Sequence, residues 1–216
     1  IHSFINFFFL KKDVPRTGVH EIFNREIGQS SLKKVLLAFC ISNPEIGYAQ
    51  TLSLIGARIL RVMKMNEEKS FYILTVLIKI LFPDYFSNGM KGLLTDLEVF
   101  HIMFVCCMPS LYFHLKSLSE DPSDPPIINP FVSSWVSSLF SQMLSHDKLL
   151  RLWDSILIEG TEMLLRHSLA IFFLMERDLL KIRTPLEFYT IMSSLPQLLQ
   201  DVNCPLFPGY SLLQVN

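Results

Sequence analysis

The chain has 216 residues, which is enough for one large domain or two small ones with a buried core. Hydrophobic residues make up 50% of the sequence and charged residues only 18%, which argues against a disordered chain because burial of this much apolar surface offsets the loss of chain entropy. The 19 lysines and arginines nearly balance the 20 aspartates and glutamates, so the sequence lacks the basic character of a nucleic-acid-binding protein.

The apolar and cysteine patterns bear on the compartment of the protein. Residues 4–10 are apolar but too few for a signal peptide and lack preceding basic residues. Longer apolar stretches are interrupted by polar residues and prolines within the roughly 20 residues that a membrane-spanning helix needs. The four cysteines show no C-x-x-C spacing. We therefore expect a cytoplasmic protein without a transmembrane segment, whose other regions could associate peripherally with endomembranes.

Helical periodicity dominates the chain. Apolar residues at i, i+3, i+4 and i+7 predict amphipathic helices over residues 32–40 and 149–157. The alternation typical of strands is scarce, so we predict an all-α fold of many helices. The proline-rich segment 119–130 separates two helical regions. We expect a single domain over the whole chain, with an N-terminal lobe at about 1–118 and a C-terminal lobe at about 131–216.

Local signals mark several helix ends. Thr95 with Glu98, and Thr184 with Glu187, have the spacing of a capping box, which predicts helix starts at both places. Gly160 follows an apolar helical pattern and predicts a helix end.

No phosphate-binding loop, dinucleotide fingerprint or metalloprotease motif occurs in the sequence, so a self-contained enzyme is not indicated.

The first of two polar segments that stand out runs from Leu10 to Gly18. Pro15 disfavours helix at the residue before it, and Gly18 allows a turn. Arg16 is therefore expected on a loop, with Asp13 three residues before it. Taken alone, an ordinary solvated arginine is the commoner interpretation.

The second polar segment begins where Asn43-Pro44 breaks the preceding helix. A new helix is expected to start near Gly47, which places Tyr48 and Gln50 close to its N-terminus. Such a terminus favours anionic groups such as phosphate. Taken alone, Gln50 would be an ordinary glutamine on a helix surface.

Together these two segments resemble the fingerprint of the TBC domains that activate Rab GTPases. That family has an I-x-x-D-x-x-R motif followed some thirty residues later by Y-x-Q, and here Gln50 follows Arg16 by 34 residues. Later segments also resemble the family: Trp135 with Leu139-Phe140 matches W-x-x-x-L-F, and residues 150–154 match L-R-I-W-D. The similarity covers residues 8 to about 180. We expect Trp135 and Trp153 in these segments to be core residues.

The resemblance implies a mechanism and a partner. Arg16 and Gln50 would be the catalytic residues: Arg16 would neutralise charge at the transferring phosphoryl group, and Gln50 would orient the attacking water. Asp13 would hold the Arg16 loop, and Tyr48 would support the Gln50 end of the site. The partner would be a GTP-bound Rab-family GTPase in vesicle trafficking. The chain itself needs no cofactor, because GTP and Mg²⁺ belong to the partner.

Two alternatives remain open at this stage. Thr51-Leu52-Ser53 stands where the family has G-M-N, and the loss of glycine adds a β-branched side chain where backbones could approach closely. This departure motivates a catalytically weak TBC-fold module that binds a small GTPase or another partner as a scaffold. The other alternative is a helical scaffold with a chance motif match, which would place Arg16 and Gln50 far apart.

Overall fold

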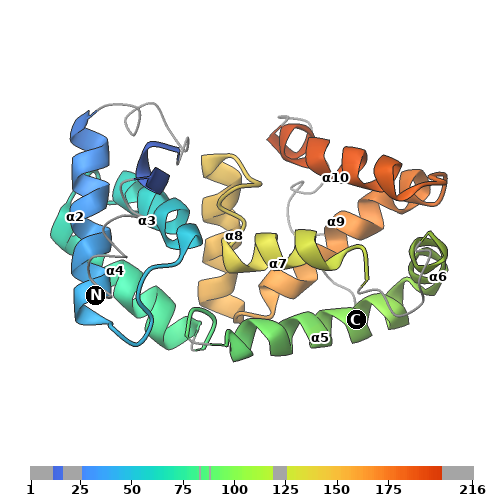
Figure 1. Ribbon diagram of the computed structural model, residues 1–216, viewed down its shortest axis with the longest axis horizontal. Helices are drawn as coiled ribbons and strands as arrows, with labels where there is room; N and C mark the ends of the chain where they lie inside the picture. The colour runs from blue at the N-terminus through green and yellow to red at the C-terminus, as the bar shows by residue number, and fades with distance from the viewer. Residues whose placement is uncertain (1–11, 17–25, 83, 88, 119–125, 201–216) are drawn as a thin grey trace. The chain divides into compact units, whose positions relative to one another are not determined.

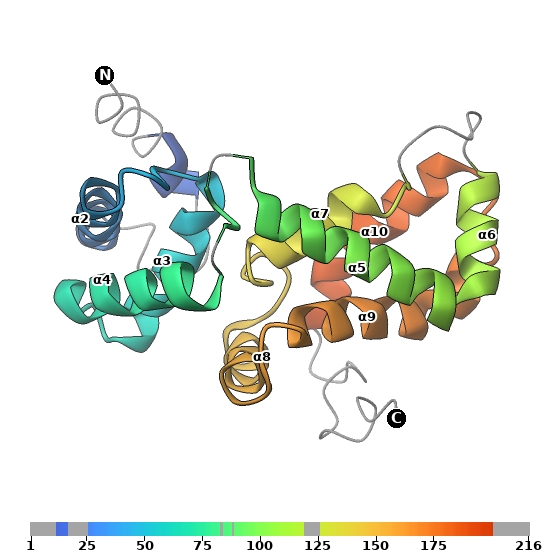
Figure 2. The ribbon, with the colours of Figure 1, turned by 90° about the horizontal axis from the view of Figure 1, so that it is seen from below.

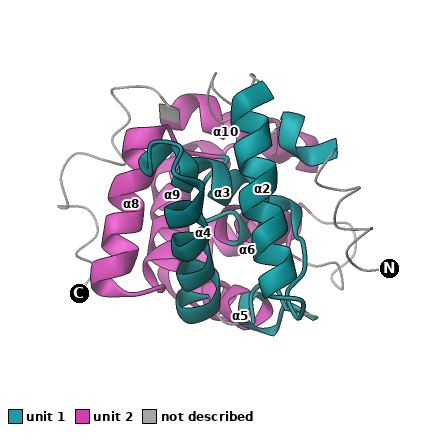
Figure 3. Cartoon of the chain, turned by 90° about the vertical axis from the view of Figure 1, so that its left-hand side faces the viewer, with its two compact units in different colours: residues 1–93, 137–142 teal, residues 94–136, 143–216 magenta. Residues whose placement is uncertain are grey.

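Every regular element in the described part of the chain is helical (Figure 1). The structure is a computed structural model, and it describes residues 12–16, 26–82, 84–87, 89–118 and 126–200. The predicted all-α fold is therefore confirmed. The chain forms two compact units, coloured separately in Figure 3, which comprise residues 1–93 with 137–142 and residues 94–136 with 143–216.

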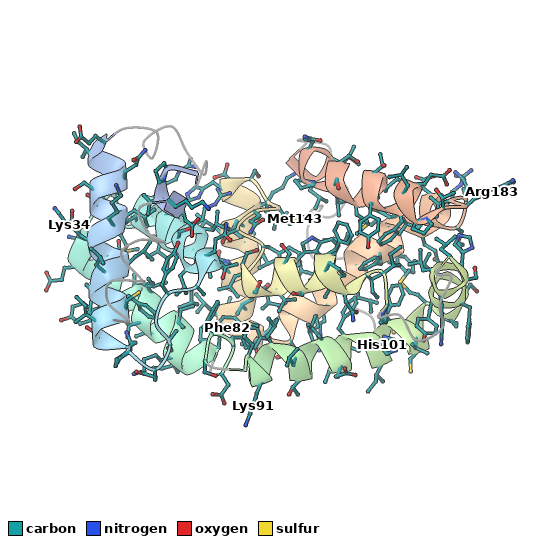
Figure 4. All side chains as sticks on the ribbon, in the orientation of Figure 1. Lys34, Phe82, Lys91, His101, Met143 and Arg183 are labelled. Carbon is teal, nitrogen blue, oxygen red and sulfur yellow. The ribbon has the colours of Figure 1, made fainter. Side chains whose placement is uncertain are left out.

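In its described residues, the first unit contains three packed helices and two short helical segments. Their bounds are η1 (Val14–Arg16), α2 (Glu26–Ser42), α3 (Gln50–Val62), α4 (Glu67–Val76) and the π-helical segment η3 (Leu77–Leu81). Helices α2, α3 and α4 contact one another, as Figures 1 and 2 also show. Leu32, Leu36 and Phe39 recur at helical spacing and are buried, as the periodicity of this segment predicts. Figure 4 shows Lys34 extending outward from the opposite side of α2.

The second unit packs its helices around aromatic side chains. Its elements are α5 (Lys91–Cys107), α6 (Pro109–Ser117), α7 (Asn129–Ser137), α8 (His146–Glu159), α9 (Met163–Leu179) and α10 (Pro185–Gln200). The ring of Phe172 on α9 lies 6.0 Å from Phe100 and 5.0 Å from Phe104 on α5, between ring centroids. The described helices on both sides of residues 119–125 belong to this one unit, apart from residues 91–93 and 137 at the ends of α5 and α7.

Two predicted helix ends are confirmed. Helix α10 begins at Pro185, and the Thr184 side chain accepts a hydrogen bond from the backbone N–H of Glu187 at 3.3 Å. The Glu187 carboxylate in turn accepts one from the backbone N–H of Arg183 at 2.7 Å. Helix α8 ends at Glu159 and is followed by Gly160, whose φ of 111° is a conformation that glycine adopts at low cost.

Two other local predictions are wrong. Helix α5 begins at Lys91 rather than at Thr95, because the buried Leu93 gives the earlier turn apolar packing that a capping signal does not register. Trp135 is buried as expected, whereas Trp153 is only half-buried on α8.

Among the described helices, none is by itself long and apolar enough to cross a membrane. Helices α5 and α6 reach the required length and hydropathy only as a pair, and the chain bends by 109° between them.

Candidate functional site

The first motif is anchored by a buried valine. Val14 opens the short helix η1 and is fully buried in the first unit, while Asp13 before it is half-buried and Pro15 after it is exposed. Arg16 is the last residue of η1; its side chain lies outside the described residues, as do Leu10 and Gly18. The backbone that carries Arg16 therefore follows directly from a residue packed in the core.

The second motif begins with a loop that is tied to the end of α2. Asn43 is buried, and its side-chain amide donates a hydrogen bond to the backbone oxygen of Phe39 at 2.8 Å. The backbone oxygen of Asn43 accepts a hydrogen bond from the backbone N–H of Gly47 at 3.0 Å. Gly47 has a φ of 67°, a backbone conformation that is strained for a residue with a side chain. These contacts set the direction in which the chain enters α3.

Helix α3 begins at Gln50 rather than near Gly47. Ala49 before it has an extended backbone conformation, and its oxygen accepts a hydrogen bond from the N–H of Leu52 at 3.0 Å. Gln50 is therefore the first residue of the helix, and it is exposed. The helix terminus favours negative charge near this residue. The Ser53 hydroxyl donates back to the Gln50 oxygen at 2.8 Å, which closes the first turn.

A side-chain hydrogen bond joins the two motifs. The Tyr48 hydroxyl donates to the Asp13 carboxylate at 3.1 Å, across 35 residues of sequence. Arg16 lies about 6 Å along η1 from Asp13 at the rise of a 3₁₀ helix. Gln50 lies at most about 7 Å from Tyr48 along an extended chain. The structure thus brings Asp13 and Tyr48 into contact and ties the backbones of Arg16 and Gln50 to that contact.

The surroundings of this hydrogen bond keep the phenol neutral. Burial raises the pKa of Tyr48 above its ordinary value, and the nearby Asp13 carboxylate raises it further, while a hydrogen bond with Ser53 offsets part of this effect. Tyr48 therefore remains a hydrogen-bond donor throughout the physiological pH range. Asp13 and Tyr48, which sequence reasoning assigned to separate ends of the site, support each other.

Two supporting residues were not singled out from the sequence. Asn43 holds the loop, although its position before a proline had indicated only a helix end. Cys40 on α2 donates through its thiol to the Gly47 oxygen at 3.4 Å, and burial raises the pKa of this thiol to about 11. Its place on the apolar stripe of α2 was the available signal. Among the residues that the structure describes, no three histidine, cysteine, aspartate or glutamate side chains gather into a metal site.

Comparison with known proteins identifies related chains. TBC1 domain family member 30 of Homo sapiens is 35% identical over 196 residues, which are 86% of this chain and 21% of that protein. TBC1 domain family member 2A of Homo sapiens is 33% identical over 159 residues, covering 73% of this chain and 16% of that protein. The chain thus spans about a fifth of the length of these relatives.

Solved structures share the fold. The crystal structure of the Chlamydomonas flagellar RabGAP TBC domain superposes with a TM-score of 0.69 at 22% identity, covering 88% of this chain and 65% of that one. The crystal structure of the Ypt/Rab-GAP domain of Gyp1p gives a TM-score of 0.75 at 16% identity, covering 91% of this chain and 67% of that one. Residues 5–180 match the family described as the Rab-GTPase-TBC domain. The chain belongs to the Rab-GTPase-TBC domain family.

Proposed function

We propose that this chain accelerates GTP hydrolysis by a Rab-family GTPase and supplies Arg16 and Gln50 to the GTPase active site. The observation that carries the proposal is the Tyr48–Asp13 hydrogen bond, because it ties together the two segments that bear these residues. Membership of the Rab-GTPase-TBC domain family supports the choice of partner. A chance match of two unrelated motifs would give no reason for their direct contact.

The roles of Arg16 and Gln50 follow from what limits GTP hydrolysis by the GTPase alone. Hydrolysis is limited by charge that develops on the phosphoryl oxygens and by the placement of the attacking water. Arg16 stabilises that charge with its planar guanidinium, and an arginine supplied by a second protein is worth about 10³–10⁵ in rate. Gln50 places the water through its side-chain amide. GTP and Mg²⁺ enter the site with the partner.

The supporting residues Asp13 and Tyr48 act by positioning the segments that carry Arg16 and Gln50. Asp13 and Tyr48 hold η1 against the entrance of α3, so that the arginine and the glutamine approach one nucleotide together. The buried Val14 and Asn43 fix the backbones on either side of that contact. A site prepared in this way needs little rearrangement when the partner binds.

The experiment that tests the proposal measures single-turnover hydrolysis by a panel of GTP-loaded Rab proteins, with and without the chain. We expect at least one Rab to be accelerated strongly, and the acceleration to fall at least about 100-fold in Arg16→Ala. Binding of the GTP-bound and GDP-bound forms is measured in parallel, and tighter binding of the GTP-bound form is expected. Equal rates with and without the chain across the panel would contradict the proposal.

A second candidate function is a scaffold that binds a small GTPase with weak catalysis. It is favoured by Thr51, which is half-buried in the first turn of α3 directly beside Gln50. Leu52 and Ser53 are buried in the first unit and so face away from a partner. The same panel separates the two functions, since binding without acceleration supports the scaffold. Thr51→Gly then tests the cause: a restored rate would assign the weakness to this side chain.

A further inference from the structure

Helix α3 contains a charged residue that the proposed mechanism does not use. Arg58 is only 7% exposed, and its guanidinium donates a hydrogen bond through Nη2 to the backbone oxygen of Ser141 at 2.9 Å. Burial, together with the nearby Arg61, lowers the pKa of Arg58 to about 10, so that the side chain stays charged at neutral pH. Burying this charge is costly unless it is hydrogen-bonded, which gives the contact with Ser141 its importance.

The segment that accepts this hydrogen bond has an unusual backbone. Residues 137–142 belong to the first unit although the chain on both sides of them belongs to the second. Leu139 and Phe140 have φ values of 48° and 60°, and both side chains are buried. Successive non-glycine residues in the left-handed region are uncommon and persist only where the surrounding structure holds them. Arg58 binds this turn one residue after Phe140.

The hydrogen bond acts on the helix that presents Gln50. Arg58 follows Gln50 by eight residues, which is about 12 Å along the axis of α3. The apolar residues of α3, such as Leu52 and Ile55, are closely packed, but their burial energy has no directional requirement and opposes a small rotation or slide of the helix less sharply than a hydrogen bond does. A charged hydrogen bond to a fixed carbonyl does not tolerate such a shift.

We propose that Arg58 is a positioning residue of the GTPase-activating site, which holds α3 against the 137–142 turn and so determines where Gln50 is presented. This inference rests on the proposed function. Besides its packing against α2 and α4, helix α3 then has two long-range polar contacts, Tyr48–Asp13 just before its first residue and Arg58–Ser141 two turns further on. Loss of the second contact leaves the arginine half of the site in place and displaces the glutamine half.

The test compares Arg58→Met with Arg61→Met, a matched control three residues later on the same helix at a half-exposed position. We expect Arg58→Met to lower the single-turnover rate constant about 10-fold at saturating chain, with the half-saturating concentration unchanged, and Arg61→Met to change neither. In a Gln50→Ala background, Arg58→Met should cause no further loss, whereas in an Arg16→Ala background its effect should persist. Equal losses in both backgrounds would overturn the inference.

Two additional measurements keep the test decisive. Arg58→Lys retains the charge and a donor, so we expect it to lose less than the roughly 10-fold expected for Arg58→Met, and this expectation can be tested even if Arg58→Met does not fold. A lysine variant that folds normally but loses about 10-fold or more would count against a positioning role through this bond. If the unchanged chain accelerates no Rab, the proposed function fails, and amide hydrogen exchange then decides the inference. Exchange at residues 52–55 should be faster in Arg58→Lys than in Arg61→Lys, and equal exchange would overturn it.

Discussion

The two compact units of this chain hold their helices by different means. In the first unit, polar side chains reach across the sequence to fix the segments that carry the motifs, as in the Tyr48–Asp13 and Arg58–Ser141 contacts. In the second unit, aromatic rings gather around Phe172, and Trp135 lies 5.6 Å from it between ring centroids. The second unit has a long-range polar contact as well, since Lys148 donates to the backbone oxygen of Leu199 at 2.7 Å.

This difference separates stability from positioning. Burial of apolar surface is strong and its free energy is non-directional, so it contributes mainly to the stability of the fold. Hydrogen bonds add less net stability, yet they are directional and costly to leave unmade when buried. We therefore expect changes in the aromatic cluster to affect unfolding and changes in the polar contacts of the first unit to affect catalysis.

The largest expected effect lies in the second unit. Phe172→Ala should lower the free energy of unfolding by about 3–5 kcal/mol, because it empties a fully buried ring position. Urea unfolding measures this loss, and GTP hydrolysis per folded molecule should stay within about 2-fold of the original. Phe173→Ala is the control, since Phe173 is 62% exposed and its loss should cost less than about 0.5 kcal/mol. A large loss of activity per folded molecule in Phe172→Ala would contradict the expectation that the aromatic cluster affects unfolding rather than catalysis.

The next effect belongs to the first unit. Arg16→Lys and Gln50→Ala should each lower the single-turnover GTPase rate at least about 100-fold, equivalent to about 2.7 kcal/mol, since neither replacement reproduces the lost donor geometry. Thermal melting should be unchanged in both. Gln197→Ala, at an exposed glutamine of α10 in the second unit, serves as the control and should leave the rate as it is. Full activity of Gln50→Ala would leave only the arginine part of the mechanism.

A pH effect of intermediate size distinguishes the cysteines of the two units. Cys40 is buried and its pKa is raised to about 11, whereas the pKa of an unfolded cysteine is near 9. Above pH 9 the unfolded chain loses this proton and the folded chain keeps it, so stability falls with rising pH by up to about 1.4 kcal/mol per unit until about pH 11. Urea unfolding between pH 8 and 10.5 should show a shallower fall in Cys40→Ala. The exposed Cys106 is the control, and Cys106→Ala should follow the original curve.

The smallest effect shows that not every polar contact in the first unit matters. Lys34 on α2 and Glu67 on α4 form an ion pair at 3.1 Å, but their side chains are 63% and 36% exposed. Lys34→Ala should therefore change the free energy of unfolding by less than about 0.5 kcal/mol, and added salt should remove the difference. A loss above about 1 kcal/mol in urea unfolding would mean that exposed polar contacts also hold this unit together.

Local signals in the sequence predicted much of the fold. The end of α8 before Gly160 and the start of α10 after Thr184 depend on residues within four positions of each end, so a reader of the sequence can find them. The start of α5 was missed because Leu93 is buried in the first turns of the helix, and a capping signal does not record burial. Trp153 was misassigned to the core for a related reason: periodicity gives the direction of a side chain but not how much of it neighbouring elements cover.

The site was predictable in its parts but not in its assembly. The order of Asp13, Arg16, Tyr48 and Gln50 is visible in the sequence, and it points to the family. The hydrogen bond between Tyr48 and Asp13 depends on how η1 packs against α2, which no local pattern records. The catalytic roles of Arg16 and Gln50 stay predictions.

The central claim is that the Tyr48–Asp13 hydrogen bond unites two motifs into one site, and a double-mutant cycle tests it most directly. Single-turnover GTP hydrolysis is measured with Tyr48→Phe, Asp13→Ala and the double variant, and with Tyr72→Phe on α4 as an exposed control. We expect each single variant to be about 10-fold slower and the double variant to be no slower than either, a coupling of about 1.4 kcal/mol. Losses that multiply to about 100-fold in the double variant, or single variants as fast as the original, would contradict the claim.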